Sequence, residues 1–257
     1  MPRADVDLIV IGGGIHGAGV ARDAARRGVS VSLFERSDFG SGTSSASSKL
    51  VHGGLRYLER LQLRLVRESL VERSTLMRIA GHLVRPLPFL APIYDDAPRS
   101  RAWMDMGLWL YDILSTGHSL GRHRWLGPEA VHELEPGLST RGLRGAFLFH
   151  DAQMNDARLC LETVLSAQHH GAQVRNYTPV EELVVDGGRV RGVRFGNGQE
   201  LRARVVLNAA GPWVHRIGAQ QQLAEPVEPR LSRGSHILTR PLPRGHALLL
   251  SLSLIHI

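Results

Sequence analysis

Three glycines near the start of the chain, Gly12, Gly14 and Gly17, have the spacing that binds the pyrophosphate of a dinucleotide. The first lets the chain turn sharply, the second lets the backbone approach the pyrophosphate, and the third lets a helix pack closely on a strand. Gly13 lies inside the same turn. Glu35 follows about twenty residues later, where a carboxylate accepts hydrogen bonds from ribose hydroxyls and disfavours a 2′-phosphate. This pattern suits NAD and FAD equally.

A run of hydroxyl side chains follows this acid and can supply further hydrogen bonds. Serine-rich runs are often only flexible polar loops. Because this one comes directly after the second apolar segment of a nucleotide-binding pattern, we interpret its hydroxyl and backbone groups as donors to a diphosphate. The candidates are Thr43, Ser44, Ser45, Ser47 and Ser48.

The segment that holds these hydroxyls, TSSASSKLVHGGLRYLE at residues 43–59, resembles the signature of flavin-dependent glycerol-3-phosphate dehydrogenases. That family belongs to the flavoprotein group that includes D-amino-acid, glycine and sarcosine oxidases. Three further segments agree in the same order, namely Asp156–Leu159, Asn208–Trp213 and Arg233–Ile237. The resemblance reaches about residue 250, after which the chain departs from the family pattern and is expected to be truncated.

The resemblance implies a non-covalently bound FAD. It places Lys49 and Leu50 beside the flavin and His52 in the adjoining glycine loop. It also implies that the backbone of Val180 meets the adenine and that Gly211 lets the chain approach the cofactor closely.

The same resemblance identifies candidates for substrate contact and proton transfer. Arg56 presents a planar fork of donors that matches phosphate oxygens, and the family places Tyr57 beside it. His236 matches a pocket histidine that can accept the proton of a secondary alcohol. The implied reaction oxidises sn-glycerol 3-phosphate to dihydroxyacetone phosphate and passes the electrons to membrane quinone.

Two alternatives to this reaction stay open at this stage. Arg56 can hold a carboxylate as well as a phosphate, which allows an FAD-dependent amine or 2-hydroxy-acid oxidoreductase of the same superfamily. The chain as written can also be an FAD-binding fragment without turnover.

Positioning these residues requires a sheet and helices, and the pattern predicts an α/β fold. We expect a Rossmann-like FAD-binding domain of the D-amino-acid oxidase and glycine oxidase kind, interrupted by an inserted, incomplete α+β substrate domain. Residues 1–82 and 145–222 are assigned to the first domain, and residues 83–144 and 223–257 to the second.

Periodicity and prolines predict the main elements. Helices are expected at 57–80, 99–115 and 128–136, with extended chain or an edge strand at 82–94 between the first two. The stripe of Trp103, Met106 and Leu110 is interpreted as core packing rather than as a membrane-dipping face. A hairpin is predicted around residues 186–188, and the apolar strand within 203–211 is expected to be buried.

Composition limits the partners. The net charge is +7, and Lys49 is the only lysine, but the arginines are interspersed with acids, which argues against nucleic acid and leaves peripheral contact with anionic lipid. The single cysteine, Cys160, is expected to be buried and excludes an intramolecular disulfide. No metal-ligand spacing, signal peptide or membrane span is recognised, so we expect no metal and a cytoplasmic protein. The family resemblance implies peripheral contact with the cytoplasmic face of the inner membrane. A homodimer stays open.

Overall fold

The computed structural model describes residues 4–219, 234–237 and 245–250, and the chain divides into two compact units. Unit 1 consists of Met1–Ser48 and Asp156–Ser235, and unit 2 consists of Lys49–Asn155 and His236–Ile257. Each unit is therefore assembled from two separate stretches of sequence.

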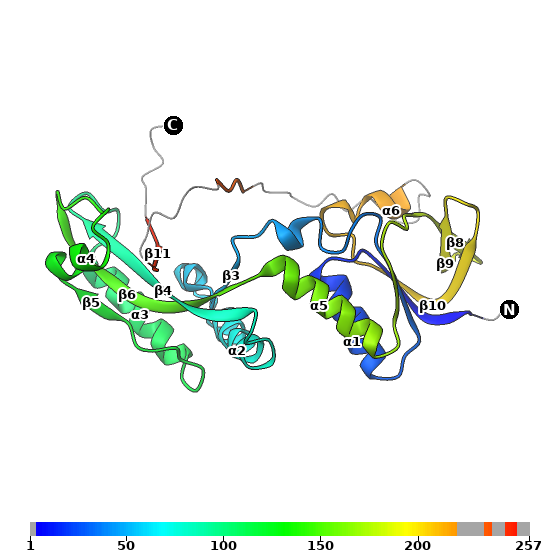
Figure 1. The fold of residues 1–257 in the computed structure, drawn as a ribbon, viewed down its shortest axis with the longest axis horizontal. Coiled ribbons are helices and arrows are strands. Elements are labelled where there is room, and N and C mark those ends of the chain that lie inside the picture. Colours follow the sequence, from blue (N-terminus) through cyan, green and yellow to red (C-terminus); the bar gives the residue numbers. More distant parts are fainter. Residues whose placement is uncertain (1–3, 220–233, 238–244, 251–257) are drawn as a thin grey trace. The chain divides into compact units, whose positions relative to one another are not determined.

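Unit 1 is built on a six-stranded sheet with the order β7-β2-β1-β10-β9-β8 (Figure 1). Strands β7, β2, β1 and β10 pair in parallel, whereas β9 and β8 continue the sheet in antiparallel fashion. The strands are β1 (Val6–Ile11), β2 (Val31–Phe34), β7 (Gln173–Arg175), β8 (Val180–Asp186), β9 (Arg189–Phe195) and β10 (Glu200–Asn208). The predicted hairpin around residues 186–188 is the connection between β8 and β9.

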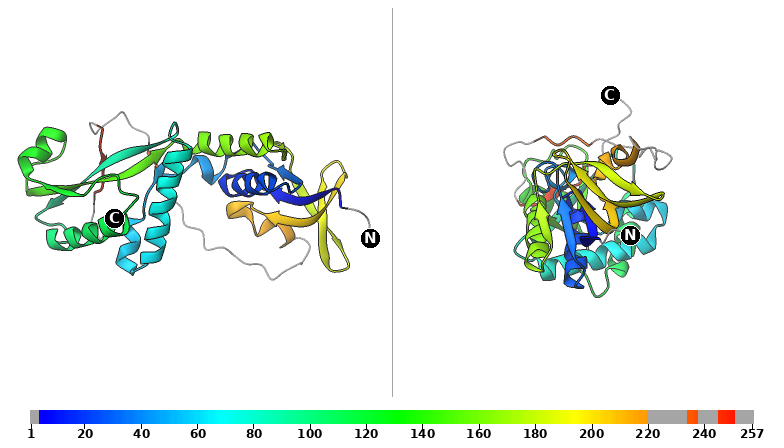
Figure 2. Two further views of the ribbon diagram at one scale, coloured as in Figure 1. Left: turned by 90° about the horizontal axis from the view of Figure 1, so that it is seen from below. Right: turned by 90° about the vertical axis from the view of Figure 1, so that its right-hand side faces the viewer.

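Two helices of unit 1, α1 (Ile15–Arg26) and α5 (Asp156–His169), pack side by side (Figures 1 and 2). They share an apolar cluster with Val10 of β1 and Leu33 of β2, while Ile9 of β1 joins a second cluster with Val193 of β9. Strand β1 is thus buried on both faces, as expected for a central parallel strand. Three short helices complete the unit: η1 (Thr43–Ser45), η3 (Gly211–Trp213) and α6 (Arg216–Ala219).

Unit 2 holds a second sheet with the order β11-β4-β6-β3, and β5 also pairs with β6. The two long strands β4 and β6 are antiparallel along their length, from Val84 opposite Met154 to Tyr94 opposite Leu143 (Figure 2). The strands are β3 (Leu50–Val51), β4 (Val84–Tyr94), β5 (Arg124–Leu126), β6 (Leu143–Met154) and β11 (Ala247–Leu248). The helices are η2 (Leu55–Arg60), α2 (Leu63–Ile79), α3 (Arg101–Leu114) and α4 (Pro128–Leu134).

The unit boundaries differ from the domain boundaries expected at residues 82 and 145. Residues 49–82 and 145–155 lie in unit 2. The physical reason is the β4–β6 pair, which extends β6 as far as Met154, and the pairing of β3 with the same strand at Gln153 and Ala152. Cutting at residue 145 would divide one hydrogen-bonded strand.

Three expectations about elements need correction. The helix predicted at 57–80 is two helices, η2 and α2, separated by Leu61, which has a φ of +53°. The predicted core stripe of α3 is wrong, because Trp103 and Met106 are exposed and the helix buries Leu108 and Tyr111 instead. Strand β10 is central in its sheet but buries only Ala203 fully among its residues.

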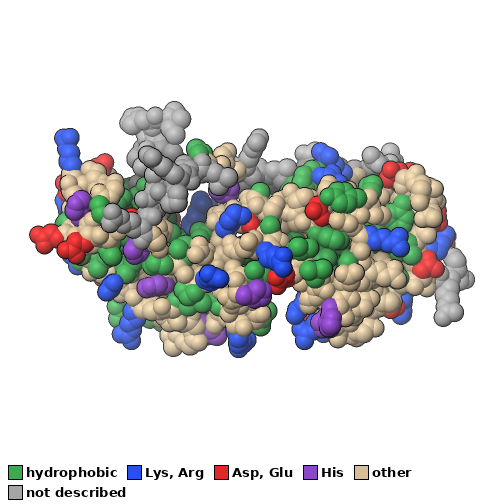
Figure 3. Space-filling view, in the orientation of Figure 1, with side chains coloured by type: hydrophobic (Ala, Val, Ile, Leu, Met, Phe, Trp, Pro, Cys, Tyr) green, Lys and Arg blue, Asp and Glu red, His purple; other side chains and the backbone are tan. Residues whose placement is uncertain are grey.

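Among the residues that the structure describes, no helix is both long and apolar enough to cross a membrane. The basic side chains on the face drawn in Figure 3 are separated from one another by apolar and acidic groups. This agrees with the mixed charge pattern of the sequence.

Candidate functional site

The glycine turn lies at the carboxyl end of β1, beside the end of β10. Gly12 has a φ of +108°, and a Cβ there would lie 2.5 Å from the carbonyl oxygen of Ala209. A Cβ on Gly17 would lie 1.9 Å from the carbonyl oxygen of Gly12, so the first turn of α1 touches the backbone of the turn. The predicted roles of both glycines follow from these contacts. In parallel sheets this edge is where nucleotides bind.

Gly14 leaves room at the N-terminus of α1. It is the N-cap residue, and among the described residues a Cβ placed on it would meet only Ser44 Oγ, at 3.1 Å. The first turn of α1 contains no acidic residue. A helix N-terminus with this open approach suits an anion such as a pyrophosphate, so the residues present fit the diphosphate of a dinucleotide.

Glu35 lies directly after β2 and turns its carboxylate toward the glycine turn. Its Oε2 accepts a hydrogen bond from the Gly13 N–H at 2.7 Å, and its Oε1 accepts one from the Ser37 N–H at 2.9 Å. A carboxylate has about four lone-pair positions, so two stay available for ribose hydroxyls. The acid therefore fixes the turn and can also hold a ribose.

The hydroxyl segment contacts the same turn. Ser44 Oγ accepts a hydrogen bond from the N–H of Ile15 at 2.9 Å, and Ser45 donates to the carbonyl of Gly42 at 3.3 Å. Thr43 and Ser48 are exposed. Ser47, expected as a donor to the diphosphate, instead donates to the carboxylate of Asp156 at 2.8 Å. The segment is thus anchored at two points to the helices α1 and α5.

The remaining candidates of unit 1 flank Glu35 and the end of β10. Val180 opens β8 shortly after Thr178, whose N–H donates to the carbonyl of Glu35 at 2.8 Å. Gly211 begins η3 with a φ of +56°. In the same helix Trp213 receives the guanidinium of Arg36 on its ring, with 4.3 Å from Cζ to the ring centroid, a contact that the sequence did not reveal.

Cys160 of α5 lies behind the glycine turn and is fully buried, as expected. Its thiol donates to the carbonyl oxygen of Gly13 at 3.6 Å. Burial raises the pKa of the Cys160 thiol to about 11. The cysteine therefore packs as a neutral side chain against the turn.

The candidates of unit 2 lie on residues 49–57. Lys49 is exposed with a φ of +58°, and Leu50 is half-buried in β3. Residues 52–57, here called the signature loop, carry His52, Arg56 and Tyr57. His52 and Arg56 are exposed, and the rings of His52 and Tyr57 are 6.5 Å apart. The loop therefore brings these three side chains onto one short segment.

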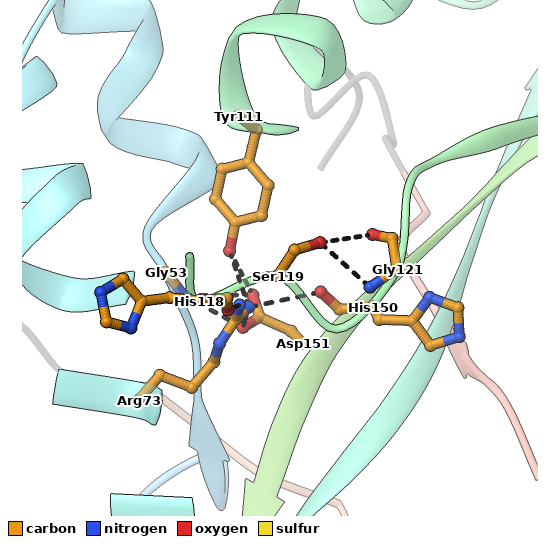
Figure 4. A network of polar contacts seen from close by, with 8 residues as sticks. All are labelled: Gly53, Arg73, Tyr111, His118, Ser119, Gly121, His150 and Asp151. Carbon is orange, nitrogen blue, oxygen red and sulfur yellow. Dashed lines mark hydrogen bonds and ion pairs between the residues drawn. The ribbon is translucent and has the colours of Figure 1, made fainter. Parts of the chain in front are cut away.

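A buried polar network binds the backbone of this loop at Gly53 (Figure 4). Asp151 of β6 accepts hydrogen bonds from the Gly53 N–H at 3.1 Å, from Arg73 Nη1 at 2.8 Å and from the Tyr111 hydroxyl at 3.0 Å. The side chains of Arg73 and Asp151 are only 1% and 4% exposed. Burial, followed by the charge of Asp151, raises the pKa of Tyr111, which keeps its hydroxyl protonated.

Sequence reasoning missed this network, although two signals were present. Asp151 is the one carboxylate of β6 and comes two residues after the apolar run 146–149, and Arg73 follows Val66 and Leu70 at helical spacing on the buried side of α2. A charge on a buried face is almost always paired.

His236 lies in the described segment 234–237, where it is exposed and outside any helix or strand. Residues 238–239 and Arg233 lie outside the described residues. Within the described residues, no group of three His, Cys, Asp or Glu side chains is arranged to hold a metal ion.

Comparison with known proteins supports the cofactor assignment. Residues 7–254 match the family model described as FAD-dependent oxidoreductase. The chain is 42% identical over 257 residues to a glycerol-3-phosphate dehydrogenase of Synechocystis sp., covering 94% of this chain and 46% of that protein. It is 36% identical over 248 residues to an alpha-glycerophosphate oxidase of Streptococcus pyogenes, covering 93% of this chain and 40% of that protein.

A solved structure agrees in sequence and fold. The glycerol-3-phosphate dehydrogenase of Bacillus halodurans, complexed with FAD, superimposes with a TM-score of 0.63 at 33% identity, covering 85% of this chain and 36% of that one. The chain thus spans about half the length, or less, of the relatives that it matches. The resemblance and the fold class inferred from the sequence are confirmed, and the chain belongs to the FAD-dependent oxidoreductase family.

Proposed function

We propose that this chain forms the FAD-binding part and a portion of the substrate site of a glycerol-3-phosphate dehydrogenase. The observation that carries the proposal is the signature loop, which contains Arg56 and Tyr57. Its backbone N–H at Gly53 is hydrogen-bonded to the buried carboxylate of Asp151. The names of the relatives supply the substrate class. FAD, when bound, supplies the two-electron acceptor for oxidation of the C2 alcohol.

In this proposal each group of the chain has a separate task. The glycine turn and the α1 N-terminus hold the diphosphate of a non-covalent FAD, and Glu35 holds the ribose. Arg56 binds the phosphate of sn-glycerol 3-phosphate through two parallel hydrogen bonds. His236 accepts the proton of the C2 hydroxyl as the alcohol becomes the ketone of dihydroxyacetone phosphate.

The substrate assignment is tested by Arg56→Lys in the complete protein. Lysine keeps the charge but loses the planar fork, so we expect glycerol 3-phosphate turnover to fall at least about tenfold, or about 1.4 kcal/mol of transition-state stabilisation. Unphosphorylated glycerol should lose little, and FAD content should not change. Arg60→Lys, an exposed change at the end of η2, is the matched control.

Equal losses for glycerol and glycerol 3-phosphate would place Arg56 at the flavin or in the fold and would remove the phosphate assignment. A faster reaction with an amine or a 2-hydroxy acid would favour the alternative oxidoreductase. Protein that binds FAD but turns over none of these substrates would identify an FAD-binding fragment.

We further propose that the electrons pass to membrane quinone and that α3 meets the lipid surface. Four apolar side chains on this helix are 52–62% exposed: Trp103, Met106, Trp109 and Ile113. Met106, Trp109 and Ile113 line a shallow groove that Asp105 borders. Arg101, in the first turn of the helix, lies over the ring of Trp125, with 4.2 Å from Cζ to the ring centroid. Exposed tryptophans on a helix of a chain with net charge +7 suit an anionic lipid interface.

Sedimentation with phosphatidylglycerol vesicles tests the lipid contact. Trp109→Glu should release the protein from these vesicles, whereas Leu165→Glu, an exposed apolar position on α5, should not. Loss of a dimer in Trp109→Glu, measured by light scattering, would instead identify the face as a contact between two copies. Formation of hydrogen peroxide in place of quinol would identify oxygen as the acceptor.

A further inference from the structure

The polar network beneath the signature loop joins three elements that are distant in sequence. Arg73 comes from α2, Tyr111 from α3 and Asp151 from β6, and all three are buried (Figure 4). Arg73 also donates to the carbonyl of His118 at 3.1 Å. An ion pair buried to this degree costs desolvation and is weak evidence for a stabilising role by itself.

The network has one contact that points to the candidate site. Both carboxylate oxygens of Asp151 accept from the N–H of Gly53, at 3.1 and 3.2 Å. The packing at this position leaves no space, since a Cβ on Gly53 would lie 2.2 Å from the Tyr111 hydroxyl and 2.3 Å from Leu70 Cδ2. The backbone at Gly53 is therefore held by a charge-assisted hydrogen bond and by direct contact.

The hydrogen bond at Gly53 constrains Arg56 and Tyr57 through a short stretch of ordered backbone. Gly54 has a φ of +79°, and the N–H of Tyr57 donates to its carbonyl at 2.8 Å, which starts η2. Arg56 lies within this turn. A shift of Gly53 would thus move the base of the Arg56 side chain.

We propose that Tyr111, Arg73 and Asp151 are positioning residues that fix the signature loop, so that Arg56 meets the substrate phosphate in one geometry. The effect on substrate rests on the function proposed above, but the hold on the loop does not. Tyr111 orients the carboxylate, Arg73 neutralises it, and Asp151 binds the loop backbone.

Tyr111→Phe tests this role with the least disturbance, because it keeps the ring and the ion pair and removes only the hydroxyl. Tyr94→Phe is the matched control, since the Tyr94 hydroxyl donates to the carbonyl of Ser139 at 3.1 Å in the same unit, away from the loop. In the FAD-loaded complete protein, Tyr111→Phe should raise KM for glycerol 3-phosphate about fivefold, equivalent to about 1 kcal/mol, with a smaller change in kcat.

Amide hydrogen exchange provides a readout that needs no substrate. Peptides covering the signature loop should exchange faster in Tyr111→Phe than in the unchanged protein and in Tyr94→Phe. If both variants lose thermal stability while loop exchange and KM stay as in the unchanged protein, the network is only structural and the proposal is wrong. If the unchanged protein does not oxidise glycerol 3-phosphate, the proposed function fails, and the exchange comparison still decides whether the network holds the loop.

Discussion

Glu35 combines two tasks in one side chain, because it holds the N–H groups of Gly13 and Ser37 and keeps lone pairs for a ribose. We expect Glu35→Ala to weaken FAD binding at least about tenfold, since hydrogen bonds to charged groups contribute about 1.5–3 kcal/mol each. Titration of FAD fluorescence measures this loss. Asp23→Ala, which removes an exposed pair with Arg27, is the control and should leave affinity unchanged. Unaltered binding in Glu35→Ala would refute the ribose assignment.

Cys160 gives a pH dependence of stability whose sign follows from its burial. Its pKa is about 11 in the folded protein, above the value of roughly 8.5 for a free thiol. Between these pH values the folded state therefore binds more protons than the unfolded state. The stability that Cys160 contributes is complete below about pH 8.5 and is lost as the pH rises toward about 11. The difference in free energy of unfolding between the unchanged protein and Cys160→Ala, measured in urea, should shrink over this range. A constant difference would contradict the burial effect.

The sequence allowed good predictions where a residue acts through its type and spacing. The contacts of Gly12 and Gly17 follow the expected pattern because the strand, the turn and the helix are adjacent in sequence. Arg73 and Asp151 were missed because their partners are distant in sequence, and the two residues of the ion pair are 78 positions apart. Local pattern carries no information on which strand passes beneath which helix.

At the scale of elements, the packing of α1 on the glycine turn is the most sensitive contact of unit 1. Gly17→Ala would place a Cβ 1.9 Å from the carbonyl oxygen of Gly12, whereas a Cβ on Gly19, two residues further along the same helix, meets nothing within 4 Å among the described residues. Overpacking should make Gly17→Ala less stable by about 1–3 kcal/mol, while Gly19→Ala should gain up to about 1 kcal/mol from helix propensity.

Urea unfolding of the two alanine variants, with FAD content as a second readout, measures this contrast. Because both changes are Gly→Ala in one helix, they share the same propensity effect and differ in the contact alone. Similar stabilities for the two variants would show that α1 shifts freely on the turn.

The elements that were predicted least well are those whose surroundings lie elsewhere in the chain. Periodicity found α3 but assigned its core face wrongly, because Trp103 and Met106 form as good an apolar stripe as Leu108 and Tyr111. The positions of β4 and β6, which cover Leu108, and of η2 and α2, which cover Tyr111, decide which stripe is buried. The break between η2 and α2 depends on the left-handed residue Leu61, a conformation that leucine rarely adopts.

At the scale of the whole molecule, the apolar clusters around β1 and those around β4 and β6 belong to different units. We therefore expect two calorimetric transitions. ADP contains only the part of FAD that the glycine turn and Glu35 would hold. At a hundredfold excess over Kd, ADP should therefore raise the free energy of unfolding of unit 1 alone by up to about 2.7 kcal/mol, and with it the temperature of that transition. Gly17→Ala should lower that same transition. One transition that ADP moves as a whole would mean that the units unfold together.

Lys49 combines two properties reported separately above. It is the sole lysine of the 257 residues, and it has a left-handed backbone conformation at the first residue of unit 2. Amine-directed chemistry on this protein is therefore confined to one side chain and the terminal amine, which peptide mapping distinguishes. A fluorophore or isotopic tag introduced on this side chain reports on the surroundings of residue 49 alone. The arginine-rich composition thus makes the chain a site-specific labelling substrate without any engineered residue.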